Sequence, residues 1–266
     1  MTTWNEHVES WSRPPVDDVG YLSSADMMTM GDTQLLHTIM TMAHTRYTGW
    51  RNHGGLWREM LRLDDTHGKD VLDFGCGVGM EAFQLQEAGN RVSLADISAT
   101  NLALAYRVLN LGDHIADPVD CFLVTDESPY ISAERGSFDV IHCSGVLHHI
   151  PWARDVMIRF HEILRPGGEV RLMLYSDYGW KIATGDENLP HWSAVTATLP
   201  GFDRFVSFMD SVGTYADWYN RDKLEIRFGD LFHVSDFAYL CEDRRFCAAV
   251  LTRKDNATIL ERLSHG

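Results

Sequence analysis

Hydrophobic and polar positions follow two different rhythms along this chain. Short apolar runs suited to buried strands recur in its middle part, at 70–74, 91–96, 120–125, 138–143 and 169–175. Segments with helical spacing separate these runs, at 80–88, 98–112 and 152–164. Because strands that alternate with helices form parallel sheets with right-handed crossovers, we expect a doubly wound α/β core over residues 69–175.

Capping residues mark the ends of two of these helices. Gly89 follows the first helix as a C′ residue, and Ser98 is placed to cap the second. The second helix is predicted to end at Gly112, and its apolar stripe includes Leu102, Ala105, Tyr106 and Leu109.

The segments that flank the core have other patterns. Residues 1–68 lack strand alternation and are predicted to form a helical cap, with Asp32 or Thr33 as the N-cap of one helix. The stripe of that helix is Leu35, Leu36, Ile39, Met40 and Ala43. Residues 176–230 are rich in aromatic side chains and lose periodicity, so we expect an insert that covers a ligand beyond the fifth strand. Residues 231–266 are predicted to form two final strands, 232–239 and 247–252, joined by a hairpin at 242–244, and a short helix after Lys254.

A glycine-rich stretch, VLDFGCGVG at 71–79, joins the first strand to the first helix. Its alternating glycines let the backbone take positive φ and let a ligand lie against the main chain. The dinucleotide fingerprint requires a third glycine where this chain has Met80, and is usually apolar where it has Asp73. Because an acid here repels a pyrophosphate but attracts an amine, the stretch favours a positively charged nucleoside over NAD.

Five segments, in order, resemble the motifs of class I methyltransferases that use S-adenosylmethionine (SAM). They are VLDFGCGVG at 71–79, LAD at 94–96, FDVI at 138–141, LHHI at 147–150 and LRPGG at 164–168. The resemblance covers residues 69–175, with a weaker match at 232–253. It implies a Rossmann-like, mostly parallel seven-stranded sheet, SAM as cofactor and S-adenosylhomocysteine (SAH) as product.

The resemblance also implies a cofactor site. It assigns the contacts with SAM to Asp73, Gly75, Cys76, Gly77 and Gly79, with Asp73 attracting the methionine amine. It assigns the ribose hydroxyls to Asp96, the adenine face to Ile97, the adenine amino group to Asp126 or Glu127, and the neighbourhood of the sulfonium to Cys143 and Ser144. Any of these acids and glycines has a plain alternative role in a turn or a helix cap.

The loop before the first strand, 46–55, combines aromatic, cationic and glycine residues and is placed to fold over a ligand. Trp50 either contacts the cofactor or anchors the loop. Arg46 or Arg51 either pairs with the SAM carboxylate or is a solvated loop cation.

Histidines are the candidates for acid–base chemistry. If the acceptor is a hydroxyl or an ammonium, a base must take its proton, and the pKa of histidine suits that role. His148 is the first candidate, followed by His149 and His142, and the alternative is that these residues are structural. No spacing of the H-E-x-x-H kind is present, so no metal site is predicted.

Bulk properties narrow the choice of partner. The net charge of −15 over 266 residues argues against nucleic acid and against an anionic membrane surface, because both require basic patches. The five cysteines have no C-x-x-C spacing, and no secretory signal or membrane-spanning run is visible, which favours the cytoplasm. We therefore predict methylation of a small molecule at oxygen or nitrogen. The alternatives are a SAM-binding protein that transfers no methyl group, a nucleotide-dependent oxidoreductase, and an RNA or protein methyltransferase.

Overall fold

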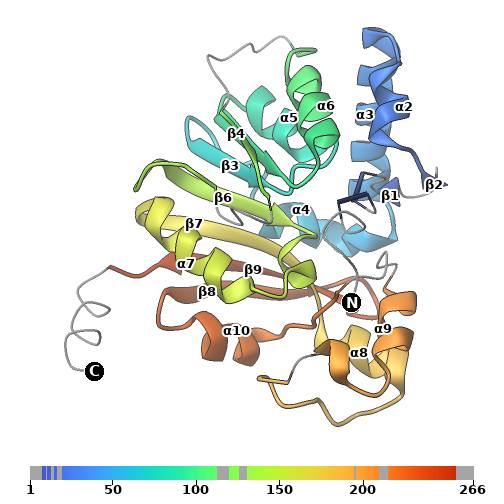
Figure 1. Cartoon of the computed structure of the whole chain (residues 1–266), viewed down its shortest axis with the longest axis vertical. Coiled ribbons are helices and arrows are strands. Elements are labelled where there is room, and N and C mark those ends of the chain that lie inside the picture. Colours follow the sequence, from blue (N-terminus) through green and yellow to red (C-terminus); the bar gives the residue numbers. More distant parts are fainter. Residues whose placement is uncertain are drawn as a thin grey trace.

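The computed structural model describes residues 8–9, 11–12, 15–16, 20–112, 120–125, 131–194, 196–209 and 215–255 (Figure 1). Within this part of the chain, one seven-stranded sheet has the order β5-β4-β3-β6-β7-β9-β8. Its strands are β3 (Asp70–Phe74), β4 (Arg91–Asp96), β5 (Cys121–Leu123), β6 (Phe138–Ser144), β7 (Leu164–Tyr175), β8 (Phe232–Leu240) and β9 (Phe246–Arg253). Neighbours from β5 to β7 pair in parallel, and β9 pairs antiparallel with both β7 and β8. The predicted fold, mostly parallel and Rossmann-like, is confirmed.

Helices cover both faces of the sheet. One face carries α5 (Met80–Glu87) and α6 (Ala99–Leu109), and the other carries α7 (Ala153–Ile163) and α10 (Arg221–Phe228) (Figure 1). Successive residues of a strand point to opposite faces, so Val71 joins the buried cluster under α5 while Leu72 joins the cluster under α7. Both faces are apolar because both are covered, as the continuous apolar runs of the strands require.

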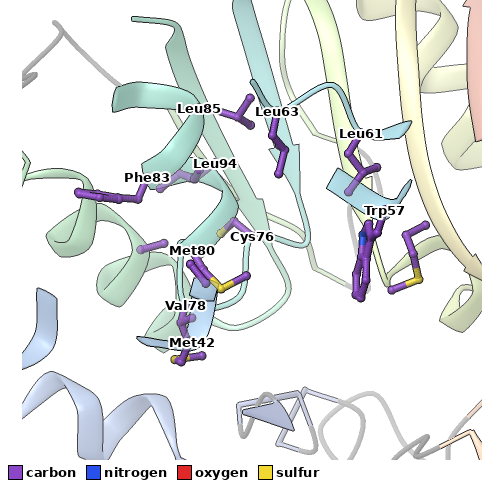
Figure 2. Packing of buried hydrophobic residues seen from close by; sticks show 14 of the residues in the cluster. Met42, Trp57, Leu61, Leu63, Cys76, Val78, Met80, Phe83, Leu85 and Leu94 are labelled. Atoms are coloured by element: carbon purple, nitrogen blue, oxygen red, sulfur yellow. The ribbon is translucent and has the colours of Figure 1, made fainter. Parts of the chain in front are cut away.

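The N-terminal cap packs on the α5 face. It consists of α2 (Ser24–Met28), α3 (Asp32–Thr48), the 3-10 turn η2 (Trp50–Gly55) and α4 (Leu56–Met60). Figure 2 shows Met42 of α3 beside Val78 and Met80, which belong to the glycine-rich stretch and the start of α5. The cap therefore contacts the segment that joins the first strand to the first helix.

Three details of the cap differ from the sequence prediction. The N-cap of α3 is Gly31, which makes no side-chain cap bond, and neither Asp32 nor Thr33 takes that place. Met40 is 50% exposed, because it lies roughly a third of a turn from the stripe formed by the buried residues of α3. A short antiparallel pair, β1 (Pro15–Val16) with β2 (Gly20–Tyr21), occurs where only helices and loops were expected.

Element ends in the core also shift. The strand predicted at 169–175 is β7, which begins earlier, at Leu164, and includes the Pro-Gly-Gly turn. The ladder between β6 and β7 has a register shift between Phe138 and Val140. The stripe of α6 excludes Tyr106, which is 51% exposed, and the helix ends at Leu109. The final hairpin of β8 and β9 is confirmed.

The insert contains α8 (Asp177–Thr184), the 3-10 turn η4 (Thr196–Thr198), α9 (Phe202–Phe208) and α10. The helix predicted after Lys254 lies outside the described residues. Of the helices in the described residues, none is both long and apolar enough to cross a bilayer. The division of the chain at residues 68, 175 and 230 stays a prediction.

Candidate functional site

The glycine-rich stretch turns through three left-handed residues, two of which are closely packed and one of which is open. Gly75, Gly77 and Gly79 have φ of 78°, 51° and 81°. A Cβ on Gly75 would lie 2.2 Å from Val146, and a Cβ on Gly79 would lie 2.8 Å from the backbone of Ala105. These two glycines are required by close packing of the loop against its neighbours. A Cβ on Gly77 would meet nothing within 4 Å, because this residue faces open space.

That open space is a cavity beyond the carboxyl ends of the strands. One group of its lining residues comes from the loop itself, the end of β4 and the start of α6: Gly75, Cys76, Gly77, Val78, Asp96, Ile97 and Asn101. A second group comes from the cap, β7, β9 and the insert: Met42, Trp57, Met173, Tyr175, Met209 and Phe246. We call the first group the loop end and the second group the chamber.

Asp96 occupies the loop end in a buried position, with 6% of its surface exposed. Its Oδ2 accepts a hydrogen bond from the Gly77 N–H at 2.9 Å, and its Oδ1 accepts from the Ser98 N–H at 2.8 Å and from Asn101 Nδ2 at 3.1 Å. Burial raises the pKa of this carboxyl, although these donors oppose the shift. A carboxylate has about four acceptor positions, so a further donor from a ligand fits beside these three bonds.

Two more carboxyls lie where the loop meets α5. Glu81 lines the cavity and accepts hydrogen bonds from Arg46 Nη1 at 2.7 Å and from the Tyr47 hydroxyl at 3.0 Å. Burial raises the pKa of Glu81, but Arg46 and the nearby His142 together lower it by a larger amount. The net shift of the pKa is therefore downward, and the carboxyl is charged. Asp73 is 3% exposed, and its Oδ2 has no hydrogen-bond partner among the described residues. Burial, then Glu81, raises its pKa well above the usual range.

The pair at 148 and 149 sits on a 3-10 turn, η3 (Leu147–His149), directly after β6. His148 is 1% exposed, lines the cavity and stacks on Tyr175 with ring centroids 3.8 Å apart. Neither of its ring nitrogens has a hydrogen-bond partner among the described residues. Burial, with a smaller contribution from His149, lowers the pKa of His148 well below 6.5. The ring is therefore neutral at pH 7 and has a lone pair with which to accept a proton.

His149 also lines the cavity, but unlike His148 its ring makes a hydrogen bond. Its Nδ1 lies 3.0 Å from the carbonyl oxygen of Tyr215. Because a carbonyl only accepts, Nδ1 carries the hydrogen and donates it. The His149 ring also contacts Trp11, with centroids 4.5 Å apart.

Strand alternation separates the remaining candidates of β6. Ser144 lines the cavity, whereas the Cys143 side chain faces the α7 cluster and is fully buried there. Burial raises the pKa of the Cys143 thiol, so it is not a nucleophile at neutral pH. His142 is buried on the cap side, behind the cavity lining, and burial lowers its pKa to about 4.

Other predicted residues fall at or beyond the edge of the site. Trp50 is 50% exposed and packs against Phe246 and the Arg245 guanidinium, outside the cavity lining. Its role in cofactor binding stays a prediction, as does that of Asp73, which is buried and is not among the described lining residues. Asp126, Glu127 and the side chain of Arg51 lie outside the described residues. Arg46 lines the cavity, paired with Glu81.

Sequence reasoning missed most of the chamber. Trp57, Tyr175, Met209 and Phe246 come from segments far apart in the chain, and no motif links them. For Tyr175 a signal was available, because it is the last residue of a strand whose carboxyl end borders the cavity.

Residues 72–170 match a family model described as a methyltransferase domain. The core of this chain is thus similar to a methyltransferase domain. Among curated proteins, it is 38% identical over 114 residues to the ubiquinone biosynthesis O-methyltransferase of Thiobacillus denitrificans, covering 41% of this chain and 47% of that protein. It is 36% identical over 107 residues to the enzyme of the same name from Pseudomonas aeruginosa, covering 40% and 44%. The chain thus spans about half the length of the curated relatives it matches.

Solved structures share the fold of the methyltransferase domain at low sequence identity. A SAM-dependent methyltransferase from Mesorhizobium loti superposes with a TM-score of 0.55 at 19% identity, covering 74% of this chain and 96% of that one. The N-methyltransferase NodS from Bradyrhizobium japonicum, solved in complex with SAH, superposes with a TM-score of 0.51 at 17% identity, covering 75% and 86%.

The cofactor of this family is SAM, and the residues at the loop end fit it. The Gly77 backbone faces open space where a side chain would stand, so it offers a surface on which a ligand can lie. Asp96 has room for a hydroxyl donor beside it. Glu81 and Asp96, both in the lining, favour a ligand that carries positive charge over one that carries a pyrophosphate.

Proposed function

We propose that this protein transfers the methyl group of SAM to the oxygen or nitrogen of a small, uncharged acceptor and releases SAH. The observation that supports this proposal is a single cavity lined by two unlike groups of residues. The loop end offers bare backbone and Asp96 to a nucleoside, and the chamber offers aromatic and thioether side chains to a second molecule. His148 lies in the same lining.

The charges in the lining argue for a neutral acceptor. The charged side chains among the described lining residues are Arg46, Glu81 and Asp96. Arg46 is already paired with Glu81 at 2.7 Å. A phosphate or carboxylate on the acceptor would therefore lose its water without gaining a cation, which costs several kcal/mol in a buried site. Nucleic acid is disfavoured for the same reason, and the curated relatives are named as O-methyltransferases.

Methyl transfer from SAM requires no covalent bond between the protein and either reactant. SAM supplies a methyl group on a sulfonium, and the acceptor atom displaces the sulfur from it. The protein must align the acceptor atom with that methyl group and exclude water, and such alignment is worth roughly 7–11 kcal/mol. The side chains of the chamber provide walls for both tasks. We propose that neutral His148 accepts the proton that the acceptor loses, through one of its unpartnered ring nitrogens.

We also propose the reducing cytoplasm as the setting. All five cysteines are free, and Cys76, Cys143 and Cys247 are buried as small apolar side chains.

The proposal is tested in two steps. Titration with SAH by calorimetry, with a mass spectrum of any co-purified ligand, tests the cofactor, and we expect a dissociation constant in the micromolar range. Transfer of labelled methyl from SAM is then measured on paired acceptors, such as neutral phenols and anilines against their carboxylated analogues. We expect product only with the neutral members.

Three outcomes would overturn the proposal or part of it. A folded protein that does not bind SAH lacks the proposed cofactor site. Binding of SAH without transfer to any component of a cell extract would indicate a SAM-binding protein of another kind. Transfer to RNA or protein would replace the small acceptor by a macromolecule.

A further inference from the structure

A short extended segment of the insert holds three residues of the cavity wall. It comprises residues 215–219, and we call it the strap. The Tyr215 carbonyl accepts from the His149 ring at 3.0 Å, and the Asp217 N–H donates to the His148 carbonyl at 2.8 Å. The Tyr219 N–H donates to the Tyr175 carbonyl at 2.8 Å. His148, His149 and Tyr175 all line the cavity.

The strap is not part of the main sheet. Residues 215–218 have no regular secondary structure, and a single isolated bridge joins Tyr219 to Ser176. The ladder of the sheet therefore does not determine where the strap lies. In an extended chain the backbone groups of alternate residues point to the same side. The Tyr215 carbonyl and the N–H groups of Asp217 and Tyr219 therefore face the same part of the cavity wall. Its backbone hydrogen bonds and the buried side chains of Ala216, Trp218 and Tyr219 hold it, and a buried carboxylate adds a further anchor.

The anchor is the carboxylate of Asp217, which is 2% exposed. It receives hydrogen bonds from four donors in three parts of the insert: Thr196 Oγ1 at 2.5 Å, Lys223 Nζ at 2.7 Å, the Trp218 N–H at 2.9 Å and Arg227 Nη1 at 2.9 Å. Thr196 belongs to η4, and the two cations belong to α10. The carboxylate thus ties the strap to both.

Lys223 makes this anchor unusual. Its side chain is 2% exposed, and its ammonium lies 3.9 Å from the centre of the Trp218 ring. A buried ion pair is weak evidence for stability, because removing both ions from water offsets most of their attraction, and an apolar side chain of similar volume often serves the fold as well. The Asp217 carboxylate can, however, accept all four hydrogen bonds in only one arrangement of the strap. We therefore expect it to determine where the strap lies.

We propose that Asp217 is a positioning residue of the methyl-transfer site: through the strap it fixes the turn that carries His148 and His149, and the end of β7 at Tyr175. Lys223, Arg227 and Thr196 hold Asp217 in place. The consequence for catalysis rests on the proposed function, whereas the effect on the histidine rings does not. Asp217 does not line the cavity and acts through the residues it positions.

The test compares the full chain with Asp217→Asn and Lys223→Met. Lys223→Met is the variant that carries the test if Asp217→Asn does not fold, because it replaces a buried cation by an apolar side chain of similar length. The control is Glu225→Gln, which alters an exposed ion pair with Arg221 on the same helix. Nitrogen-15 spectra of the histidine rings, assigned with a His149→Gln variant, report tautomer and titration.

In the wild type and the control, we expect His149 to show only the Nδ1–H tautomer, and His148 to stay neutral well below pH 6.5. In the folded variants we expect a mixture of His149 tautomers and a pKa of His148 that rises towards 6.5. SAH affinity should change less than twofold, since the loop end does not touch the strap. With an identified acceptor, kcat should fall on the order of 10–100-fold, the effect of misplacing a reacting group by about 1 Å.

If either variant folds and shows the histidine spectra of the wild type, the proposed positioning role of Asp217 is refuted. Absence of SAH binding in every sample, wild type included, would refute the proposed function instead and leave the strap to be decided by the spectra.

Discussion

Substitution of Gly77 by alanine separates two functions of the glycine-rich loop, its backbone conformation and its open face. Gly77 has φ of 51°, and a Cβ added there would meet no atom within 4 Å. Gly77 also lines the cavity. The new methyl group would therefore stand in the space that we assign to the cofactor. We expect Gly77→Ala to leave the fold intact and to weaken SAH binding.

A second glycine provides a matched control. Gly68 precedes β3, at the end of the strand far from the cavity; it has φ of 63°, and a Cβ there would also meet nothing within 4 Å. A left-handed conformation costs an L-residue about 1–2 kcal/mol, and the lower entropy of the unfolded alanine chain offsets part of this equally in both variants. In a domain of this size, both should lower the melting temperature by roughly 2–8 °C.

The assays are thermal unfolding and calorimetric titration with SAH. Gly68→Ala should bind SAH like the wild type. Gly77→Ala should raise the dissociation constant on the order of tenfold or more, since about 1.4 kcal/mol corresponds to a factor of ten. Wild-type affinity in Gly77→Ala would refute the placement of the cofactor against this backbone, and equal weakening in Gly68→Ala would show that the loss has a global cause.

Three further perturbations test titratable side chains in and behind the cavity lining. Asp96→Ala should weaken SAH binding by about 1.5–3 kcal/mol, the contribution of hydrogen bonds to a charged group, and unchanged affinity in the calorimeter would mean that the ribose lies elsewhere. The pKa of His142 falls from 6.5 to about 4 on folding, so the unfolded chain binds the extra proton and the wild type loses about 3 kcal/mol as the pH falls through that window. Urea unfolding at pH 7 and pH 4 should show this loss reduced in His142→Gln, and an identical pH dependence would contradict it. Arg46→Met should destabilise by about 3–5 kcal/mol because it leaves Glu81 buried without its cation, and adding Glu81→Gln should restore part of the loss in the same unfolding assay.

The parts of the fold that the sequence predicted well are those with local signals. The bounds of β3 and β4 agree with the prediction, since each strand is a short apolar run between polar residues. Ser98 caps α6 through its side chain, and Gly89 has the positive φ of a C′ residue. The errors arise where a tertiary contact overrides the local pattern, as at Met40, whose helix turns a different stripe towards the core.

The candidate site divides in the same way. The geometry of Gly77 and Asp96 follows from a strand that ends, a turn that needs positive φ and a helix that begins, all of which leave marks within a few residues. The chamber has no such marks, because Trp57, Tyr175 and Phe246 meet only when the cap, β7 and β9 have assembled. Asp217 was missed for a related reason: in sequence it is one acid among many in an acidic chain, and its burial depends on Lys223 and Arg227 reaching it from α10.

Under the proposed function, this division has a consequence for the choice of acceptor. The loop end is built from backbone conformation and from hydrogen bonds within 71–101, and the cap supports it where Ser24 Oγ donates to Asn101 Oδ1 at 2.5 Å and where Met42 packs beside Val78. The chamber combines Met42 and Trp57 of the cap and Met209 of the insert with side chains of β7 and β9. Thioether side chains adapt to differently shaped neighbours at little cost. Substitutions at Met209 should therefore alter which acceptors are methylated while SAH binds as in the wild type, and a parallel loss of both would show that the two groups of lining residues do not act separately.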